Sequence, residues 1–388
     1  MIISDNAFNY ELDKSKIKKS WMPIFEYYNE NGDNVLDTEE LAKLKADIDL
    51  ADENQDDVIS KEESKNLLHK ILPELKLKKR HLNGFLKALQ KNYIYTIENM
   101  SDGIIDWAAQ GKVGDCWLLS EVRSMSHTEW GSKAIKDSIC YNSENKTYRV
   151  MLKGVNFACE ITSREIKKAR RKHKKSKGDI DVLLLEIATE KYFRQEVEAG
   201  RMNCDTNNLL NGNKLFGKQT MQYMLTGNTG CCICIDNQKP ELMSEEEVAE
   251  WKENAPDEYA HLMENENVIF YAWKDEQKNG VLEELAKEAE GGYSVICTFK
   301  ESSEWNNPDK YSDEEKQDEF SNTDCHAYMI EAIIIRDDGS KFLILNNPHE
   351  PNILLYKEAD EFFDQVECIY ATNKDDNYEQ LKSICAIE

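Results

Sequence analysis

The sequence lacks several features that would assign it to whole classes of protein. It has no run of 18 apolar residues, so we expect no membrane span. Its start, MIISD, shows no basic stretch followed by a long apolar one, so we expect no secretory signal and a cytoplasmic location. Positive charge is scarce, since 49 Lys and Arg face 74 Asp and Glu. The resulting net charge of −25 argues against nucleic acid and anionic membranes as partners.

The eleven cysteines show no spacing typical of a disulfide framework. Their odd number and their distribution indicate reduced thiols. Cys231, Cys232 and Cys234 form a dense group that suggests half of a metal site. Because no partner pair lies in register with them, the sequence favours a buried strand over a metal site there.

One cysteine has a different context. Residues 110–117 read QGKVGDCW, and the apolar residues that follow recur at spacings of four and three: Leu118, Val122 and Met125. This pattern predicts a helix that begins near Cys116, with Asp115 as its N-cap. A thiol in the first helical turn is close to unpaired backbone N–H groups and to the positive end of the helix dipole, and both favour the nucleophilic thiolate. Gln110 is then a candidate donor to a developing oxyanion.

A single histidine stands in a comparable position. His326 precedes the apolar run 327–335, the turn-forming segment 336–340 and a second apolar run that leads to Asn347. The pattern predicts a β-hairpin with His326 and Asn347 near its open end. A turn centred on residues 338–339 leaves these two residues four positions out of register, about 13 Å along a strand. We therefore expect a bulge or a wider loop between them.

These three motifs, QGxxGDCW, His-Ala-Tyr and Asn-Pro, resemble the protease core of the calpains. The resemblance implies an α+β, papain-like fold with two subdomains, a helical half that carries the Cys and a β-rich half that carries the His and Asn. It also implies that Cys116 attacks the substrate, His326 is the base, Asn347 orients His326 and Gln110 contributes to the oxyanion hole. In the family a Trp usually follows Asn-Pro, whereas this chain has His349. The departure predicts a less shielded Asn–His contact.

A second pattern lies upstream. Two twelve-residue segments, 29–40 and 52–63, have oxygen side chains at the positions of a calcium loop and a backbone carbonyl at the seventh. The predicted Ca²⁺ ligands are Asn29, Asn31, Asp33, Val35, Asp37 and Glu40 in loop 1, and Asp52, Asn54, Asp56, Val58, Ser60 and Glu63 in loop 2.

The two loops depart from the common pattern at position six. Gly is usual there, but the chain has Asn34 and Asp57, two residue types that tolerate the left-handed region. We expect Leu36 and Ile59 to pair and join the loops. Residues 26–63 hold 14 acidic and 3 basic side chains, and this crowding favours a bound cation.

The sequence thus predicts four parts: a calcium-binding module of the EF-hand type over 1–75, a connecting helix over 76–99, a Cys subdomain over 100–228 and a His/Asn subdomain over 229–388. Within the core, the resemblance implies a further calcium site, for which Asp106, Asp179 and Asp181 are candidates. The basic run 167–177, with eight Lys or Arg, predicts an exposed loop.

The function expected from these features is that of a calcium-dependent cysteine endopeptidase acting on protein or peptide substrates. Two alternatives remain. The first is a calcium-binding scaffold with an impaired protease core, which His349 suggests. The second is a papain-like acyl transferase.

Overall fold

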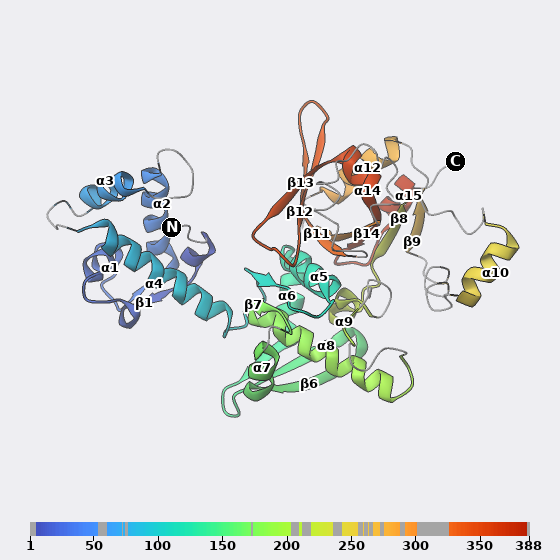
Figure 1. Ribbon diagram of the computed structural model, residues 1–388, viewed down its shortest axis with the longest axis horizontal. Coiled ribbons are helices and arrows are strands. Elements are labelled where there is room, and N and C mark those ends of the chain that lie inside the picture. Colours follow the sequence, from blue (N-terminus) through green and yellow to red (C-terminus); the bar gives the residue numbers. More distant parts are fainter. Residues whose placement is uncertain are drawn as a thin grey trace. The chain divides into compact units, whose positions relative to one another are not determined.

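The computed structural model describes residues 5–52, 60–71, 73, 77–171, 174–202, 209–211, 219–235, 243–254, 259, 263, 267–271, 275–287, 292–300 and 326–385. The chain divides into two compact units, residues 1–100 and 101–388, which are described separately (Figure 1). Within the described ranges, no helix is long and apolar enough to cross a membrane.

The first unit is mainly helical. Its elements are η1 (Asp5–Asn9), β1 (Leu12–Asp13), η2 (Lys14–Lys16), α1 (Met22–Tyr28), β2 (Val35–Leu36), α2 (Thr38–Ala51), α3 (Lys61–Ile71) and α4 (Lys79–Ile97). Pro23 lies in the first turn of α1, where its missing N–H breaks no helical hydrogen bond. Helix α4 buries the predicted apolar face and packs against α3 and η1, so it belongs to the same unit as the predicted calcium loops.

The second unit combines helices and strands, which confirms the expected α+β class. It begins with β3 (Ala108–Ala109), α5 (Cys116–Ser126), α6 (Glu129–Ser138), β4 (Ile139–Asn142), β5 (Thr147–Leu152), η3 (Lys153–Val155), β6 (Phe157–Thr162), α7 (Ser163–Arg170), β7 (Lys177–Gly178), α8 (Ile180–Glu198) and α9 (Met221–Thr226). It continues with β8 (Cys231–Ile235), α10 (Glu245–Asn254), β9 (Val268–Tyr271), α12 (Asp275–Leu285), β10 (Ser294–Phe299), β11 (Ala327–Ile335), β12 (Lys341–Asn346), β13 (Leu354–Glu358), α14 (Ala359–Gln365), β14 (Val366–Thr372) and α15 (Glu379–Cys385).

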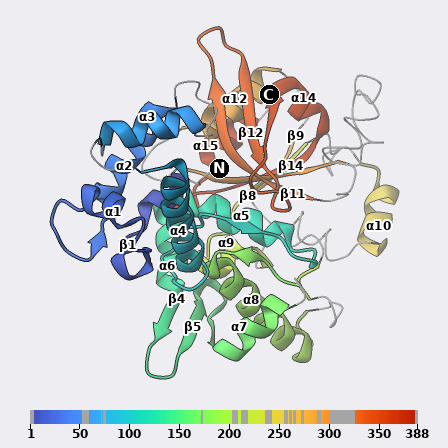
Figure 2. The same cartoon turned by 60° about the vertical axis from the view of Figure 1, so that its left-hand side comes forward.

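A seven-stranded sheet organises this unit, in the order β13-β12-β11-β10-β14-β8-β9. Its pairs are antiparallel except for β8 and β9. One face packs against α12, α14 and α15 in one apolar core. The other face packs against α5, α8, α9 and the small β4–β6 sheet in a second core (Figure 2).

Two buried hydroxyl groups fix helix α5 against the large sheet. Ser120 Oγ donates to the carbonyl of Ala327 in β11 at 2.9 Å, and Ser124 Oγ accepts from the backbone N–H of Val295 in β10 at 2.7 Å. A buried hydrogen bond of this kind is expensive to break because both partners lose their water. Helix α5 is therefore held against both strands along its length.

The predicted hairpin is formed by β11 and β12, and its register explains how its open end closes. Glu331 is an extra residue that shifts the pairing between Ile330 and Ala332. When the register beyond this bulge is continued, His326 lies opposite His349. Asn347 is then two positions away, which is a diagonal cross-strand neighbour within side-chain reach. The expected bulge is confirmed.

Candidate active site

Cys116 is the first residue of α5, as predicted, and only 9% of it is exposed. The backbone N–H of Ala327, the residue after His326, lies within hydrogen-bonding reach of the thiol. The start of α5 and the start of β11 therefore meet at this sulfur. Asp115 occupies the N-cap position, but its side chain makes no capping hydrogen bond, so that part of the prediction is wrong.

The structure brings His326 and Asn347 together. The imidazole Nε2 lies 2.9 Å from Asn347 Oδ1, so Nδ1 is the ring nitrogen left for a proton from a substrate or a thiol. His326 is only 4% exposed, and its ring also meets Tyr328 edge-on with centroids 4.8 Å apart. These contacts fix the orientation of the ring.

His349 lies beside the His326 ring, at the sequence position where a Trp is usual in the family that the motifs resemble. Its imidazole stacks on that of His326, with centroids 4.9 Å apart and planes 11° from parallel. Its backbone N–H donates to Asn347 Oδ1 at 2.9 Å. The sequence predicted a less shielded Asn–His contact, and the structure places an imidazole against the His326 ring in place of the indole.

The backbone of Gln110 contacts the residue that follows Asn347. Its N–H donates to the carbonyl of Pro348 at 2.8 Å, which ties the loop before Cys116 to the end of the hairpin. Its side chain is turned toward its own loop, where Nε2 donates to the Val113 carbonyl at 2.7 Å. Gln110 could therefore donate a hydrogen bond to an oxyanion only through the second N–H of this amide or from a different rotamer.

The basic run has a structural role that the sequence did not predict. The N–H groups of Lys112 and Val113 donate to the Lys174 carbonyl, so the run supports the loop before Cys116. Lys175 is buried and its Nζ lies 2.9 Å from a Glu190 carboxylate oxygen. A Cβ on Gly111 would approach the Lys174 carbonyl to 2.5 Å, so this position requires glycine. The exposed-loop expectation is wrong for Lys175 and Ser176, which are buried, whereas Lys174 is exposed.

The protonation of the two reactive groups follows from their burial. Burial raises the pKa of the Cys116 thiol to about 11, although the Ala327 N–H acts in the opposite direction. Burial lowers the pKa of His326 to about 4; the Asn347 hydrogen bond opposes this shift and His349 adds to it. In this conformation the pair is thus a neutral thiol and a neutral imidazole. The thiolate predicted from the helix start is outweighed by desolvation.

The burial of two acidic residues near Cys116, Asp115 and Glu186, was not predicted from the sequence. Burial and the neighbouring Glu186 raise the pKa of Asp115 well above its ordinary value. Glu186 accepts from the backbone N–H and the hydroxyl of Ser176, the segment that adjoins the Cys116 loop. The Glu lies in α8, 71 positions after Asp115, and no sequence spacing announces such a pairing.

The first predicted calcium loop, residues 29–40, is described in full. Asn29, Asn31 and Asp33 each accept a backbone N–H of the loop, and Glu40 accepts from three N–H groups, those of Glu30, Asn31 and Asp37. The left-handed residue is Gly32, at position four, and not Asn34. These oxygens suit a hard cation in type. However, no three acidic oxygens of this described loop lie within 4.8 Å of one another. Calcium would have to draw Glu40 away from its N–H partners.

Loop 2 is described only at its ends. Ser60 and Glu63 bond to each other's backbone N–H, the same box that Asp37 and Glu40 form at the end of loop 1. Of the other predicted ligands of this loop, Asp52 is the buried C-cap residue of α2, whereas Asn54, Asp56 and Val58 lie outside the described residues, as does Ile59. In the described part, Leu36 pairs with Leu12 of β1.

The candidate core calcium residues interact electrostatically, although no three of their carboxylates lie within 4.8 Å of one another in the described residues. Asp181 Oδ2 accepts from the N–H groups of Asp102 and Gly103, and burial raises its pKa to about 6. Burial and the nearby carboxyl groups of Asp181, Asp102 and Asp106 raise the pKa of Asp179 well above its ordinary value. Asp181 Oδ1 is buried without a hydrogen-bond partner. Such an arrangement gains from a cation, because a cation offsets both the repulsion and the burial.

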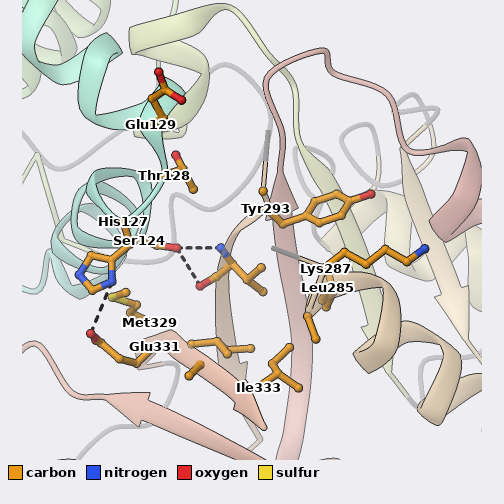
Figure 3. Close-up of a pocket in the computed structure, with 15 residues that line it drawn as sticks. Ser124, His127, Thr128, Glu129, Leu285, Lys287, Tyr293, Met329, Glu331 and Ile333 are labelled. Atoms are coloured by element: carbon orange, nitrogen blue, oxygen red, sulfur yellow. Dashed lines mark hydrogen bonds and ion pairs between the residues drawn. The ribbon is translucent and has the colours of Figure 1, made fainter. Parts of the chain in front are cut away.

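A large cavity lies at the opposite end of α5, about 15 Å along the helix from Cys116. Figure 3 shows its polar side, where His127 faces Glu331 at 3.5 Å, and its apolar side formed by Ile333 and Leu285. Its volume is about 510 Å³. Because of its place on α5, the cavity is separate from the thiol and does not form the entrance to it.

In comparisons with known proteins, no protein-family model matches the chain, and no curated protein matches it. The proposal that follows therefore depends on the motifs and on the geometry.

Proposed function

We propose that this chain is a calcium-regulated cysteine endopeptidase with a calpain-like core. The single observation that carries the proposal is that the backbone N–H of Ala327, the residue after His326, lies within hydrogen-bonding reach of the Cys116 thiol, while the His326 ring lies 2.9 Å from the side-chain oxygen of Asn347. In the sequence, Cys116 lies more than 200 residues from both His326 and Asn347.

The chemistry assigned to these residues is acyl transfer. His326 Nδ1 takes the thiol proton, and the sulfur attacks the peptide carbonyl to form a tetrahedral intermediate. The backbone N–H of Cys116 and one N–H of the Gln110 amide hold the oxyanion. The imidazolium then gives its proton to the leaving amine, and water later releases the acyl group from the sulfur. Asn347 holds the imidazole in the required tautomer.

The burial of Cys116 and His326, which favours a neutral thiol and a neutral imidazole, supports the interpretation of this conformation as a resting one. The thiol pKa is about 11 and the imidazole pKa is about 4. This difference disfavours proton transfer from sulfur to nitrogen by about 10 kcal/mol, before the attraction between the two resulting ions is counted. Activation must therefore bring water or polar groups to the sulfur and ring, or shorten the distance between them. Calcium supplies positive charge to buried carboxylates, and the carboxylates of Asp179 and Asp181 lie in the same compact unit.

A protease assay tests the proposal. Purified full-length protein is incubated with casein in calcium or in EGTA, alongside the Cys116→Ala and Cys140→Ala variants. Cys140 is an exposed thiol and serves as the matched control. We expect calcium-dependent cleavage that Cys116→Ala abolishes and Cys140→Ala retains. Cleavage that survives Cys116→Ala contradicts the assignment.

One alternative has an observation in its favour. The Gln110 side chain already bonds to Val113, and the thiol is protonated and buried, which is also what a calcium-binding scaffold with an inactive core would show. The same assay separates the two functions. A scaffold binds calcium, cleaves nothing, and leaves Cys116 unlabelled by an epoxide inhibitor in both calcium and EGTA.

A further inference from the structure

Three buried cysteines meet on one face of the large sheet, away from Cys116. Cys232 and Cys234 lie in β8, and Cys368 lies opposite Cys234 in the neighbouring strand β14. Their sulfurs are 3.4 Å apart for Cys232 and Cys234, and 3.6 Å apart for Cys234 and Cys368. All three lie within 4.8 Å of one another. The partner that the sequence analysis did not find for the Cys231–Cys234 segment is thus a residue 134 positions away.

Strand register explains why these three side chains converge. Alternate residues of a strand point to the same face, so Cys232 and Cys234 share a face while Cys231 points to the other. The pairing of Cys368 with Cys234 and of Tyr370 with Cys232 completes a square of four side chains. All four belong to the core that packs against α5, whereas Cys231 belongs to the opposite core.

We propose that Cys232, Cys234 and Cys368 form a binding site for a thiophilic d10 cation such as Zn²⁺. A point equidistant from the three sulfurs lies no more than about 2.4 Å from each, and a Zn–S bond is about 2.3 Å. The sulfurs therefore require almost no rearrangement to coordinate one ion. Hard Ca²⁺ takes oxygen ligands, so this site is distinct in chemistry from the calcium loops.

Metal binding at this site is coupled to the loss of the thiol protons. On binding, three S–H bonds break, three protons leave for solvent, and three thiolates coordinate Zn²⁺, because the thiolate and not the thiol is the metal ligand. The positive charge of the ion offsets the charge of the thiolates in this apolar core. The Tyr370 hydroxyl, within hydrogen-bonding reach of Cys368, is a polar neighbour that orients this sulfur.

The site joins β8 to β14, in the sheet that also carries β11 and therefore His326. Because the sulfurs are buried, the ion enters as the chain folds. The test therefore uses full-length protein expressed in zinc-supplemented medium and purified without chelators under reducing conditions. Zinc per chain is measured by elemental analysis and by native mass spectrometry. Cys116→Ala serves as the background, so that zinc held by Cys116 and His326 does not count.

We expect one zinc per chain in this background. Cys234→Ala should reduce the zinc content at least tenfold, whereas Cys231→Ala should leave it unchanged. Cys231 and Cys234 are a matched pair, since both lie in β8, both are 1% exposed, and they point to opposite faces. Cadmium-supplemented growth should give a thiolate-to-cadmium ultraviolet band that Cys234→Ala removes.

Three results would overturn the proposal. They are a zinc-free background protein, equal zinc in Cys234→Ala and in the background, and a chain two mass units lighter without metal, which indicates a disulfide. The first and third need no Cys234 variant, so they hold even if that variant fails to fold. Protease activity enters none of these measurements, and the failure of one proposal is therefore distinguishable from the failure of the other.

Discussion

The reactivity of the Cys116 thiol is the most direct consequence of the site's electrostatics. With a pKa of about 11, the thiolate fraction at pH 8 is about 0.1%, whereas an ordinary thiol with a pKa of about 8.5 is about one quarter thiolate. In EGTA, alkylation of Cys116 by iodoacetamide should therefore be at least about 200-fold slower than that of a free thiol at pH 8. The rate should rise about tenfold for each pH unit up to about pH 10.

The assay is a pH series of timed alkylations, with the Cys116 peptide quantified by mass spectrometry. Cys140 in the same chain is exposed and reports on the reagent itself. In EGTA, His326→Ala should leave the Cys116 rate unchanged, because a neutral imidazole does not stabilise the thiolate. In calcium, activation should move the rise to lower pH and make it depend on His326.

A plateau of the Cys116 rate below pH 8 in EGTA would refute this reasoning. It would show a stable thiolate in the resting protein, so that the helix start and the Ala327 N–H, and not burial, control the sulfur. A calcium response that is independent of His326 would contradict the role of this histidine as the base.

Three further predictions follow from the same structure. The pKa of His326 is about 4 in the folded protein and about 6.5 in the unfolded chain, so the unfolded state binds the proton first as the pH falls. The free energy of unfolding should therefore drop by about 3 kcal/mol between pH 7 and pH 4. In urea unfolding, His326→Gln should lack this loss, and the exposed-site control His69→Gln should retain it. His349→Ala removes the stacked ring and should lower the free energy of unfolding by about 1 kcal/mol and slow cleavage. His349→Trp should restore both the stability and the cleavage rate. Equal activity of the two variants and the unaltered protein would contradict the role of the ring. Because the pKa of Asp181 is raised to about 6, its ionised carboxylate lowers the free energy of unfolding by up to about 3 kcal/mol above that pH. Asp181→Asn should therefore raise the unfolding temperature in EGTA at pH 7 and reduce the further rise that calcium causes. An unchanged rise with calcium would exclude Asp181 from a cation site.

Local sequence predicted the elements that carry the candidate site. The spacing of Leu118, Val122 and Met125 identified a helix that begins at Cys116, and the structure confirms it. The apolar runs on either side of residues 336–340 identified the hairpin of β11 and β12. Both predictions succeed because helical and strand periodicity depend on residues a few positions apart.

Contacts between distant segments were beyond the sequence. The sequence predicted a bulge or a wider loop in the hairpin, but it did not place the bulge at Glu331, and that position sets His349 opposite His326. The burial of Asp115 beside Glu186 depends on how α8 packs behind the Cys116 loop. Neither residue type nor spacing encodes these neighbours.

The sequence by itself determined which residues are chemically capable: a thiol at a helix start, an imidazole before a strand, an amide after it, and oxygen side chains at calcium-loop spacing. The tertiary structure alone decided their state. It buried the thiol and the imidazole deeply enough to leave both uncharged, and it placed Cys368 against Cys232 and Cys234. The reason is physical: side-chain identity is a local property, but desolvation and proximity depend on every segment that packs around a group.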